Sequence, residues 1–357
     1  MSGVRAFLED DIPGVVALRA KCFKRSEQAS SEALVDHMRS ILFDNPWVRE
    51  DLPSLVCEAK DGSIVGFLGV LPRPMQYQEE RLWLAVPTQY MVDPDKPGIV
   101  AINLLKAFLK GPQDISMADL STDVSRKIWE SLGGLVAHPY SLYWTRPLRP
   151  MAYRASLAGK GGLGAVARPF SKILDQAAAH LPDSAYRFDG PGPEGKVEPI
   201  DLDGLLASFG DVAKRYRLSP EYSQESLVWL FDRMERNAST QAVVKARVID
   251  KAGKLSGWYV YVLTRDGRAQ VVQLFGQPGS LECVLKHLCR DAWRRGALAV
   301  SGRIQPENHR AVTSQPISLS RRGPWMLVES TRPEVREHIL AGHALLSRLE
   351  GEWWMSF

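Results

Sequence analysis

Residues 89–105 combine the residue types and the spacing that an anion-binding site needs. A strand is predicted to end at Val92, and a turn rich in Asp, Pro and Gly separates it from a predicted helix. The first N–H groups of a helix point outward and, together with the helix dipole, attract an anion such as a pyrophosphate. The predicted contacts are the side chain of Lys96 and the backbone N–H groups of Gly98, Ile99, Val100 and Ala101. The alternative interpretation is an ordinary strand–turn–helix connection without a ligand.

Two other patterns resemble ligand sites but lack the residues that would complete them. Cys283 and His287 lie four residues apart on one predicted helix. No second Cys or His pair completes a tetrahedral zinc site, so we predict no metal. Residues 159–164 match the GxGxxG pattern of dinucleotide-binding loops, but no buried strand precedes them and Pro169 interrupts the helix that should follow. A flexible connection, or a lid over a cleft, explains these glycines better than a dinucleotide site.

The composition is that of an ordinary globular protein. Of 357 residues, 45% are hydrophobic and 24% are charged, and this length accommodates two domains. The net charge of +4, without a basic stripe, gives no support to nucleic-acid binding. The four cysteines include no CxxC pair, the N-terminal segment is rich in charge, and no apolar run is long enough to span a bilayer. We therefore expect reduced thiols, a cytoplasmic location and no membrane span.

The periodicity of apolar residues predicts alternating strands and helices in the first part of the chain. The predicted strands are 4–8, 55–58, 63–71, 82–92 and 115–120, with a strand pair through Tyr143 and Trp144. The predicted helices are the segment capped by Asp11, then 31–42, 99–109 and 123–132. A connection rich in Gly and Pro follows over residues 153–195, with one helix at 167–180.

Beyond this connection the first pattern returns. Strands are predicted at 197–200, 243–249, 255–263, 270–275 and 297–301. Helices are predicted to begin at Asp201 and to cover 225–234 and 281–293. Gly253 follows Gly62 by the same number of residues as Gly257 follows Gly66. Apolar sequences typical of strands surround both pairs. This order predicts a divergent repeat of one α/β unit.

Four segments of the first half resemble the GNAT acyltransferase superfamily. These are 4–18, with a strand, an acidic cap and an apolar helix; 62–71, similar to the central hairpin; 92–105, similar to the acyl-CoA-binding motif; and 123–133, which ends Trp-Glu-Ser-Leu-Gly. The resemblance implies an α/β fold of two GNAT-like domains, each a mostly antiparallel mixed sheet flanked by helices. We expect these domains at 1–152 and 196–357, the second one degenerate and ending in an aromatic tail.

The resemblance also implies where a donor would bind. The sheet is expected to splay between its fourth and fifth strands, with coenzyme A in the gap and the backbone amides of Met91 and Val92 against the pantetheine arm. Acetyl-CoA or another acyl-CoA would be the co-substrate. The loop at 96–101 is shorter than the family pattern and keeps one glycine. The corresponding turn of the second half, 277–280, has no basic residue, so we assign donor binding to the first half.

Chemistry of this class needs a group that takes the proton of the attacking amine. Asp119 and Asp123 lie near predicted strand ends around the gap and are the first candidates, with a helix cap or a surface charge as the alternative reading of each. Trp129 stands where many family members have the tyrosine that protonates the leaving thiolate, and an indole cannot do this. The candidate for this acid is Tyr140, with Tyr90 and Tyr143 as alternatives.

The function expected from these features is acyl transfer from acyl-CoA to an amine on a small molecule or an amino sugar. Residues 257–261 and 294–303 also resemble uncharacterised bacterial GNAT-like proteins, some of which look associated with exported polysaccharides. Two alternatives stay open. One is an aminoacyl transferase similar to the Fem type, which would use charged tRNA, and the other is a non-catalytic binding module. The oligomeric state is not predicted.

Overall fold

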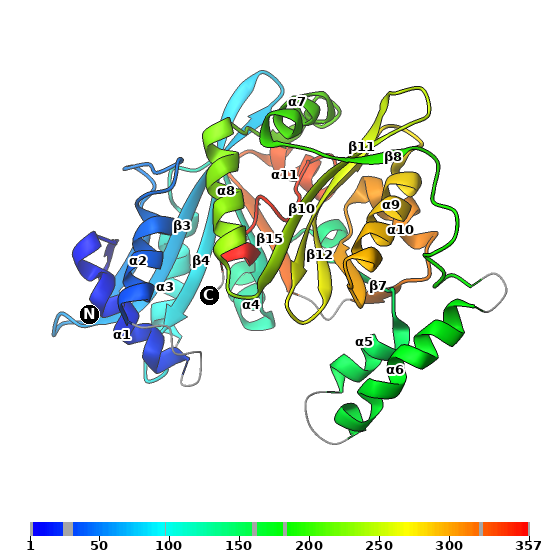
Figure 1. The fold of residues 1–357 in the computed structure, drawn as a ribbon. Helices are drawn as coiled ribbons and strands as arrows, with labels where there is room; N and C mark the ends of the chain where they lie inside the picture. The colour runs from blue at the N-terminus through cyan, green and yellow to red at the C-terminus, as the bar shows by residue number, and fades with distance from the viewer. Residues whose placement is uncertain are drawn as a thin grey trace.

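The protein is built around two mixed β-sheets with helices on their faces (Figure 1). The computed structural model describes residues 3–23, 31–96, 98–158, 163–180, 184–320 and 324–355. The first sheet contains β1 (Gly3–Ala6), β2 (Leu55–Glu58), β3 (Ile64–Tyr77), β4 (Glu80–Val92), β5 (Ile115–Ser121), β15 (Trp325–Ser330) and β6 (Leu135–Val136), with β9 (Leu218–Pro220) paired to β3. The second contains β8 (Lys196–Pro199), β10 (Thr240–Ile249), β11 (Leu255–Thr264), β12 (Arg268–Gly276), β13 (Ala299–Arg303), β7 (Tyr143–Pro147) and β14 (Ser318–Ser320).

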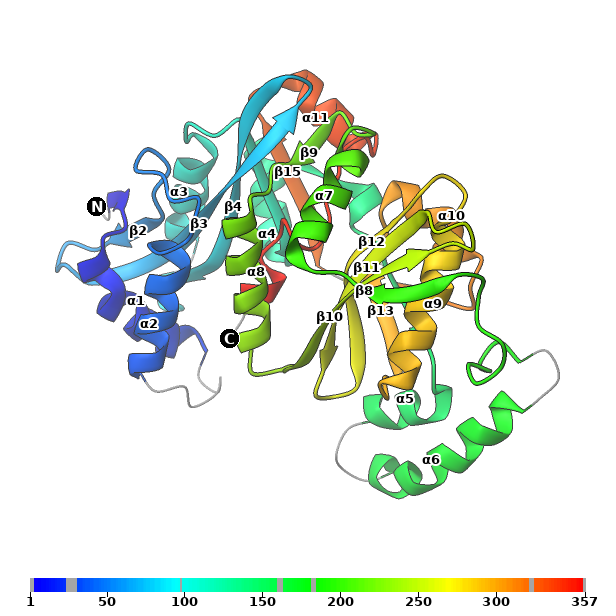
Figure 2. The ribbon, with the colours of Figure 1, turned by 45° about the horizontal axis from the view of Figure 1, so that its top comes forward.

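The helices follow the strands in a similar order in both halves. In the first half they are α1 (Ile12–Cys22), α2 (Ser31–Leu42), α3 (Ile99–Leu109) and α4 (Asp123–Ser131). The connection holds α5 (Pro150–Leu157) and α6 (Leu163–Ala179), which form a hairpin beside the second sheet (Figure 2). The remaining helices are α7 (Leu202–Ala213), α8 (Gln224–Arg236), α9 (Leu281–Arg294), α10 (His309–Thr313) and α11 (Pro333–Leu340). In the described residues, no helix has both the length and the apolar character to cross a membrane.

The two sheets have the same sequence of strand directions. In each, four antiparallel strands lead to one parallel pair, β4 with β5 and β12 with β13, and two antiparallel strands follow. The strand beside each parallel pair comes from the other half of the chain: β15 pairs with β5, and β7 pairs with β13. The expected boundaries at 1–152 and 196–357 therefore do not coincide with the boundaries of the sheets. The mixed α/β architecture itself agrees with the expectation from the sequence.

The repeated glycines occupy equivalent places in the two halves. Gly62 and Gly253 both have φ near +80°, as the tight turns of their hairpins require. A Cβ at Gly66 would lie 2.7 Å from Val100 of α3, and one at Gly257 would lie 2.9 Å from Val284 of α9. Glycine at these positions lets the helix after the parallel strand pack directly on the hairpin.

Most predicted elements occur at their expected places, with two differences in the local caps and connections. Asp11 provides no side-chain cap for α1; its carboxylate instead accepts the Leu8 N–H at 2.9 Å and pairs with Arg5 at 2.7 Å. The connection contains two helices, and the helix expected at 167–180 is the second part of α6. Residues 159–162, which hold most of the GxGxxG pattern, lie outside the described residues.

Candidate functional site

The first sheet opens where β4 and β5 diverge. The two strands pair at Leu84 with Ile115 and at Ala85 with Ser116, after which β4 continues to Val92 without a β5 partner. The register between β3 and β4 shifts just before this end, and Gln89 adopts a left-handed φ of +49°. This β-bulge redirects the backbone of β4 at the mouth of the opening. The splay predicted from the family resemblance is therefore present, and we call it the first gap.

The last residues of β4 present a backbone donor to the first gap. The N–H of Asp93 bonds to the carbonyl of Val65 on β3 at 2.9 Å. Because neighbouring N–H groups of a strand point to opposite sides, the N–H of Met91 faces β3 and that of Val92 faces the first gap. The carbonyl of Val92 accepts the thiol of Cys22 at 3.3 Å. Of the two amides predicted to contact pantetheine, Val92 is the one whose N–H is oriented for it.

The N-terminus of α3 is open beside this strand end. Its cap residue, Gly98, has φ of +85° and supplies no side-chain hydrogen bond, and nothing lies within 4 Å of where its Cβ would be. Ile99 is 65% exposed, while Val100 is buried against the sheet. Lys96 is exposed at the same turn, and Pro97 lies outside the described residues. The first N–H groups of α3 therefore point outward, and no side chain of the described residues caps them, as anion binding requires.

The C-terminal segment crosses the first gap. The backbone N–H of Glu352 donates to the Asp119 carboxylate of β5 at 2.8 Å, and Gly351 packs so closely on this carboxylate that a Cβ would overlap it. The carboxylate of Glu352 accepts hydrogen bonds from the Thr88 side chain and from the N–H of Gln89 at the bulge. Burial, reinforced by the negative charge of Asp119, raises the pKa of Glu352 to about 8. The carboxyl group of Glu352 therefore lies beside the bulge.

Asp119 belongs to a buried ionic cluster between the sheets. Its carboxylate lies 3.4 Å from the guanidinium of Arg303 at the end of β13, and both side chains are about 98% buried or more. Arg303 also donates to the carbonyl of Ser347 at 2.8 Å. Glu350 accepts from Ser347 N–H and Tyr222 hydroxyl, and burial raises its pKa to about 8. The cluster fixes the C-terminal segment in the position that places Glu352 at the bulge.

Arg73 adds an unusual cation to this cluster. Its guanidinium lies 3.8 Å from the ring centre of Trp47 and 5.4 Å from that of Trp354, and its nitrogens have no hydrogen-bond partner among the described residues. Burial lowers the pKa of Arg73 to about 9, while the nearby carboxylates of Glu350 and Asp119 oppose this change. The guanidinium therefore remains charged at neutral pH, held by two indole faces.

The other predicted catalytic residues are engaged with partners within the protein. Asp123 is exposed in the first turn of α4, where it accepts the Trp325 indole N–H at 2.8 Å; Thr122 is the helix cap. The hydroxyl of Tyr140 is buried and donates to the carbonyl of Ala344 at 2.6 Å, and burial raises its pKa. This arrangement makes Tyr140 a brace for the C-terminal segment.

The two alternative tyrosines also have protein partners. The hydroxyl of Tyr90 donates to the carbonyl of Ala101 in α3 at 2.6 Å, and burial raises its pKa. Tyr143 of β7 hydrogen-bonds to Arg303 beside the buried cluster, and burial raises its pKa as well. Trp129 is buried between Phe108 and Gly134, and its indole N–H faces the carbonyl of Val328 at 3.5 Å. Trp129 is therefore a packing residue of α4.

The second sheet has an equivalent opening, but the chain fills it. β12 and β13 pair from Arg268 to Gln270 and then diverge. The backbone N–H of Arg348 bonds to the carbonyl of Val272 on the open edge of β12 at 3.3 Å, and its guanidinium reaches the side chain of Gln270 at 3.4 Å. Only about 10 Å³ of cavity remains beside Arg348 and Arg303, less than one water molecule needs. The second opening therefore leaves no room for a donor beside these arginines.

The Cys283 and His287 pair faces a backbone carbonyl. The thiol of Cys283 lies 3.4 Å, and a ring nitrogen of His287 3.0 Å, from the carbonyl oxygen of Glu194. Within the described part of the chain, no group of three or more potential ligands is positioned for a metal ion.

Comparison with solved structures identifies the architecture. A GCN5-related N-acetyltransferase from Anabaena variabilis matches 93% of this chain and 74% of its own, with a TM-score of 0.59 and 13% identity. One from Kribbella flavida matches 92% and 70%, with a TM-score of 0.55 and 15% identity. The chain has the GNAT fold.

A further solved structure with this fold is that of an enzyme with a longer acyl group than acetyl. The N-myristoyltransferase of Saccharomyces cerevisiae, solved with bound myristoyl-CoA and inhibitors, matches 92% of this chain and 79% of its own, with a TM-score of 0.51 and 11% identity. No family model and no curated protein matches the sequence. At these identities the likeness concerns the GNAT fold alone.

Sequence reasoning did not find Glu352. It lies 233 residues beyond Asp119, in the aromatic tail, for which the sequence predicted no site residue. Trp354 does pack in the core, next to Trp229. One feature of the sequence does point to this residue. A glutamate lies on each side of Gly351 in the otherwise apolar segment 349–355, and a buried segment holds carboxylates only where partners or function require them.

Proposed function

We propose that this protein is an N-acyltransferase that binds acyl-CoA in the first gap and transfers its acyl group to an amine. The observation that supports this most is the combination of a splayed strand pair, a bulge at Gln89 and an open N-terminus of α3 within one continuous segment. The Val92 N–H would contact the pantetheine arm, and the outward N–H groups from Ile99 to Ala101 would hold the pyrophosphate with Lys96 nearby.

The proposed chemistry is direct attack on a thioester. The amine nitrogen attacks the thioester carbonyl carbon, the carbon–sulfur bond breaks, and the sulfur leaves as a thiolate. The carbonyl oxygen gains negative charge during this attack and needs a hydrogen-bond donor beside it. Binding both reactants in the first gap lowers the entropic cost of their encounter.

Glu352 is the residue that we assign as the proton acceptor. Its carboxylate lies at the bulge and has a pKa of about 8, which makes it a stronger base than an ordinary glutamate. Asp119, the candidate from the sequence, is engaged with Arg303 and with the N–H of Glu352, so its proposed role is to position Glu352. We place Asp123 after Glu352 as a candidate proton acceptor, because it lies on the exposed face of α4.

The proposal also covers the length of the acyl chain and the kind of acceptor. Acetyl-CoA is our first candidate donor, and the solved relative with myristoyl-CoA is the reason to test long acyl chains as well. The proposed acceptor is the amine of a small molecule or of an amino sugar.

The deciding experiment is thermal unfolding in the presence of acetyl-CoA, coenzyme A, myristoyl-CoA and, as a nucleotide control, ATP. A donor at 100 times its dissociation constant should stabilise the fold by about 2.7 kcal/mol. We expect stabilisation by acetyl-CoA or myristoyl-CoA that exceeds that by ATP. If none of the thioesters stabilises the protein, the enzyme proposal is wrong and a binding module is the better interpretation.

A further inference from the structure

The hairpin of α5 and α6 stands apart from the body of the protein. Its helices pack against each other and project beside the second sheet (Figure 2). A cavity of about 1580 Å³ separates it from the body, with Trp293 of α9 and Leu298 on the body side. Arg149 anchors the hairpin by donating to the carbonyls of Trp293 and Ala297 at 2.9 and 2.5 Å.

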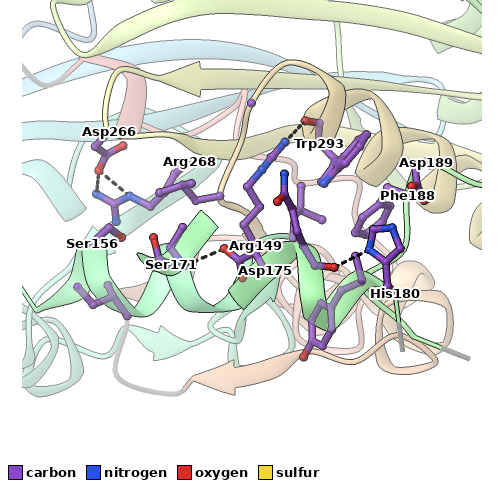
Figure 3. Close-up of a pocket in the computed structure, with 18 of the residues that line it drawn as sticks. Arg149, Ser156, Ser171, Asp175, His180, Phe188, Asp189, Asp266, Arg268 and Trp293 are labelled. Carbon is purple, nitrogen blue, oxygen red and sulfur yellow. Dashed lines mark hydrogen bonds and ion pairs between the residues drawn. The ribbon is translucent and has the colours of Figure 1, made fainter. Parts of the chain in front are cut away.

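One face of α6 is turned toward this cavity. Ser171, Asp175 and His180 line it, and Figure 3 shows them on the side of the helix that faces the body. Both carboxylate oxygens of Asp175 are used within the hairpin, because they accept the N–H groups of Met151 and Ala152 at 2.8 and 3.0 Å. The only acidic side chain of the hairpin is therefore buried as a cap of α5.

The opposite face of α6 is apolar and exposed. Phe170, Ile173, Leu174 and Ala177 recur at the spacing of one helix face, and we call them the outer stripe. Phe170 is 61%, Ile173 63% and Leu174 54% exposed. These three large apolar side chains lie on one helix face within five residues, so the outer stripe is a contiguous exposed patch.

Basic residues outnumber acidic ones in the hairpin. Residues 150–180 of the sequence contain four basic residues, Arg154, Lys160, Arg168 and Lys172, against Asp175 as the one acid. Asp175 is buried and Arg154 is exposed, so the hairpin combines an apolar stripe with an excess of positive charge in its sequence. A helix of this kind lies in the plane of a membrane interface, with apolar side chains in the acyl boundary and basic residues against anionic headgroups.

We propose that the α5–α6 hairpin docks on an anionic lipid bilayer through the outer stripe. Four side chains fall far short of the roughly 20–30 residues per partner that a stable protein–protein interface uses. Binding at a lipid surface needs no such area, because apolar insertion and electrostatic attraction add residue by residue. This proposal is independent of acyl transfer, since the hairpin shares no residue with the first gap.

The test is co-sedimentation of the full chain with large vesicles of phosphatidylcholine, with and without phosphatidylglycerol. We expect binding to the anionic vesicles that weakens as salt is added. The double variant Ile173→Glu/Leu174→Glu should lower the partition coefficient by at least about tenfold, and Arg154→Gln by about fivefold. Val228→Glu is the matched control, because Val228 is an equally exposed apolar residue on α8, and it should bind as the wild type does.

Thermal unfolding without lipid checks that each variant folds, since the replaced side chains are exposed. The proposal is overturned if the wild type does not bind anionic vesicles, or if the double variant binds them undiminished. It is equally overturned if the wild type self-associates and the double variant is monomeric, because the outer stripe would then be the interface with a second copy of the chain.

Discussion

The backbone N–H of Glu352 donates to the carboxylate of Asp119 across 2.8 Å, while the carboxylate of Glu352 accepts the N–H of Gln89 from the facing strand. The last described residues of the chain thus connect β5 to β4 where these strands separate. The same segment continues back through Arg348 to the open edge of β12. One short stretch therefore fills the gap of the second sheet and supplies a proton acceptor to the gap of the first.

Replacing Glu352 by Gln removes the proposed proton acceptor with little change of shape. We expect the rate of acyl transfer to fall by a factor of about 10² to 10⁴, while stabilisation by acyl-CoA is retained. The measurement is kcat/KM as a function of pH. In the wild type, kcat/KM should rise with pH, reach half of its maximum near the pKa of Glu352, about 8, and level off above it, because the base must be ionised.

Glu350→Gln is the control for this variant. Glu350 has the same burial-raised pKa, but its carboxylate faces Tyr222 and Ser347 instead of the bulge. The pH profile of this control should keep the wild-type form. If the Glu352→Gln variant keeps the wild-type pH profile of kcat/KM, Glu352 is not the base.

A side chain at Gly98 should block the N-terminus of α3. Gly98→Val places branched carbons beside the outward N–H groups, and we expect stabilisation by acyl-CoA to be lost in thermal unfolding. Gly98, Gly253 and Gly279 all have φ between +81° and +85° and open space around the Cβ position, so valine imposes a similar backbone strain of about 1–2 kcal/mol at each.

The two other glycines therefore serve as matched controls. Gly253 lies in a hairpin turn, and Gly279 precedes α9, the second-half equivalent of α3. Both valine variants should still be stabilised by acyl-CoA. Loss of stabilisation in Gly279→Val, with retention in Gly98→Val, would transfer the donor site to the second half.

The parts of the site that are local in sequence could be predicted. The strand ending at Val92 and the helix over Ile99–Leu109 have these bounds in the structure, because alternating and helical apolar patterns are decided by nearby residues. The resemblance to the GNAT superfamily added the splay. The open cap at Gly98 follows from glycine itself, which has no side chain to bond the first N–H groups.

The parts that depend on distant pairing could not be predicted. Nothing in Tyr143–Pro147 indicates that β7 pairs with β13 of the other half, because any half-buried edge strand has the same pattern. The same holds for β15 beside β5. Asp119 lies at the predicted strand end, but its partners Arg303 and Glu352 come from segments 184 and 233 residues away. Charge pairing over such separations leaves no local periodicity.

The buried pair of Asp119 and Arg303 should matter to stability far more than a surface pair. Arg303→Met or Asp119→Asn leaves one buried charge uncompensated, and we expect each to cost about 3–5 kcal/mol in urea unfolding. The double variant should lose less than the sum of both, since it leaves neither charge alone. Asp123→Asn removes an exposed partner of Arg126 and should cost less than about 1 kcal/mol. Additive losses in the double variant would show that the two charges do not interact.

Stability should fall as the pH rises from neutral toward 8. Burial raises the pKa of Glu350 and Glu352 to about 8 from 4.5, so between these values the folded state holds protons that the unfolded state has released. Unfolding then becomes more favourable with increasing pH. His37 has the opposite effect, because burial lowers its pKa to about 4 from 6.5, and this effect is nearly complete about one pH unit above 6.5. Urea unfolding from about one pH unit above 6.5 to pH 8 and beyond therefore reports mainly the carboxyl effect. Glu350→Gln should reduce the slope and Glu350→Gln/Glu352→Gln should reduce it further, whereas a flat wild-type dependence would mean that these carboxyls are already ionised in the fold.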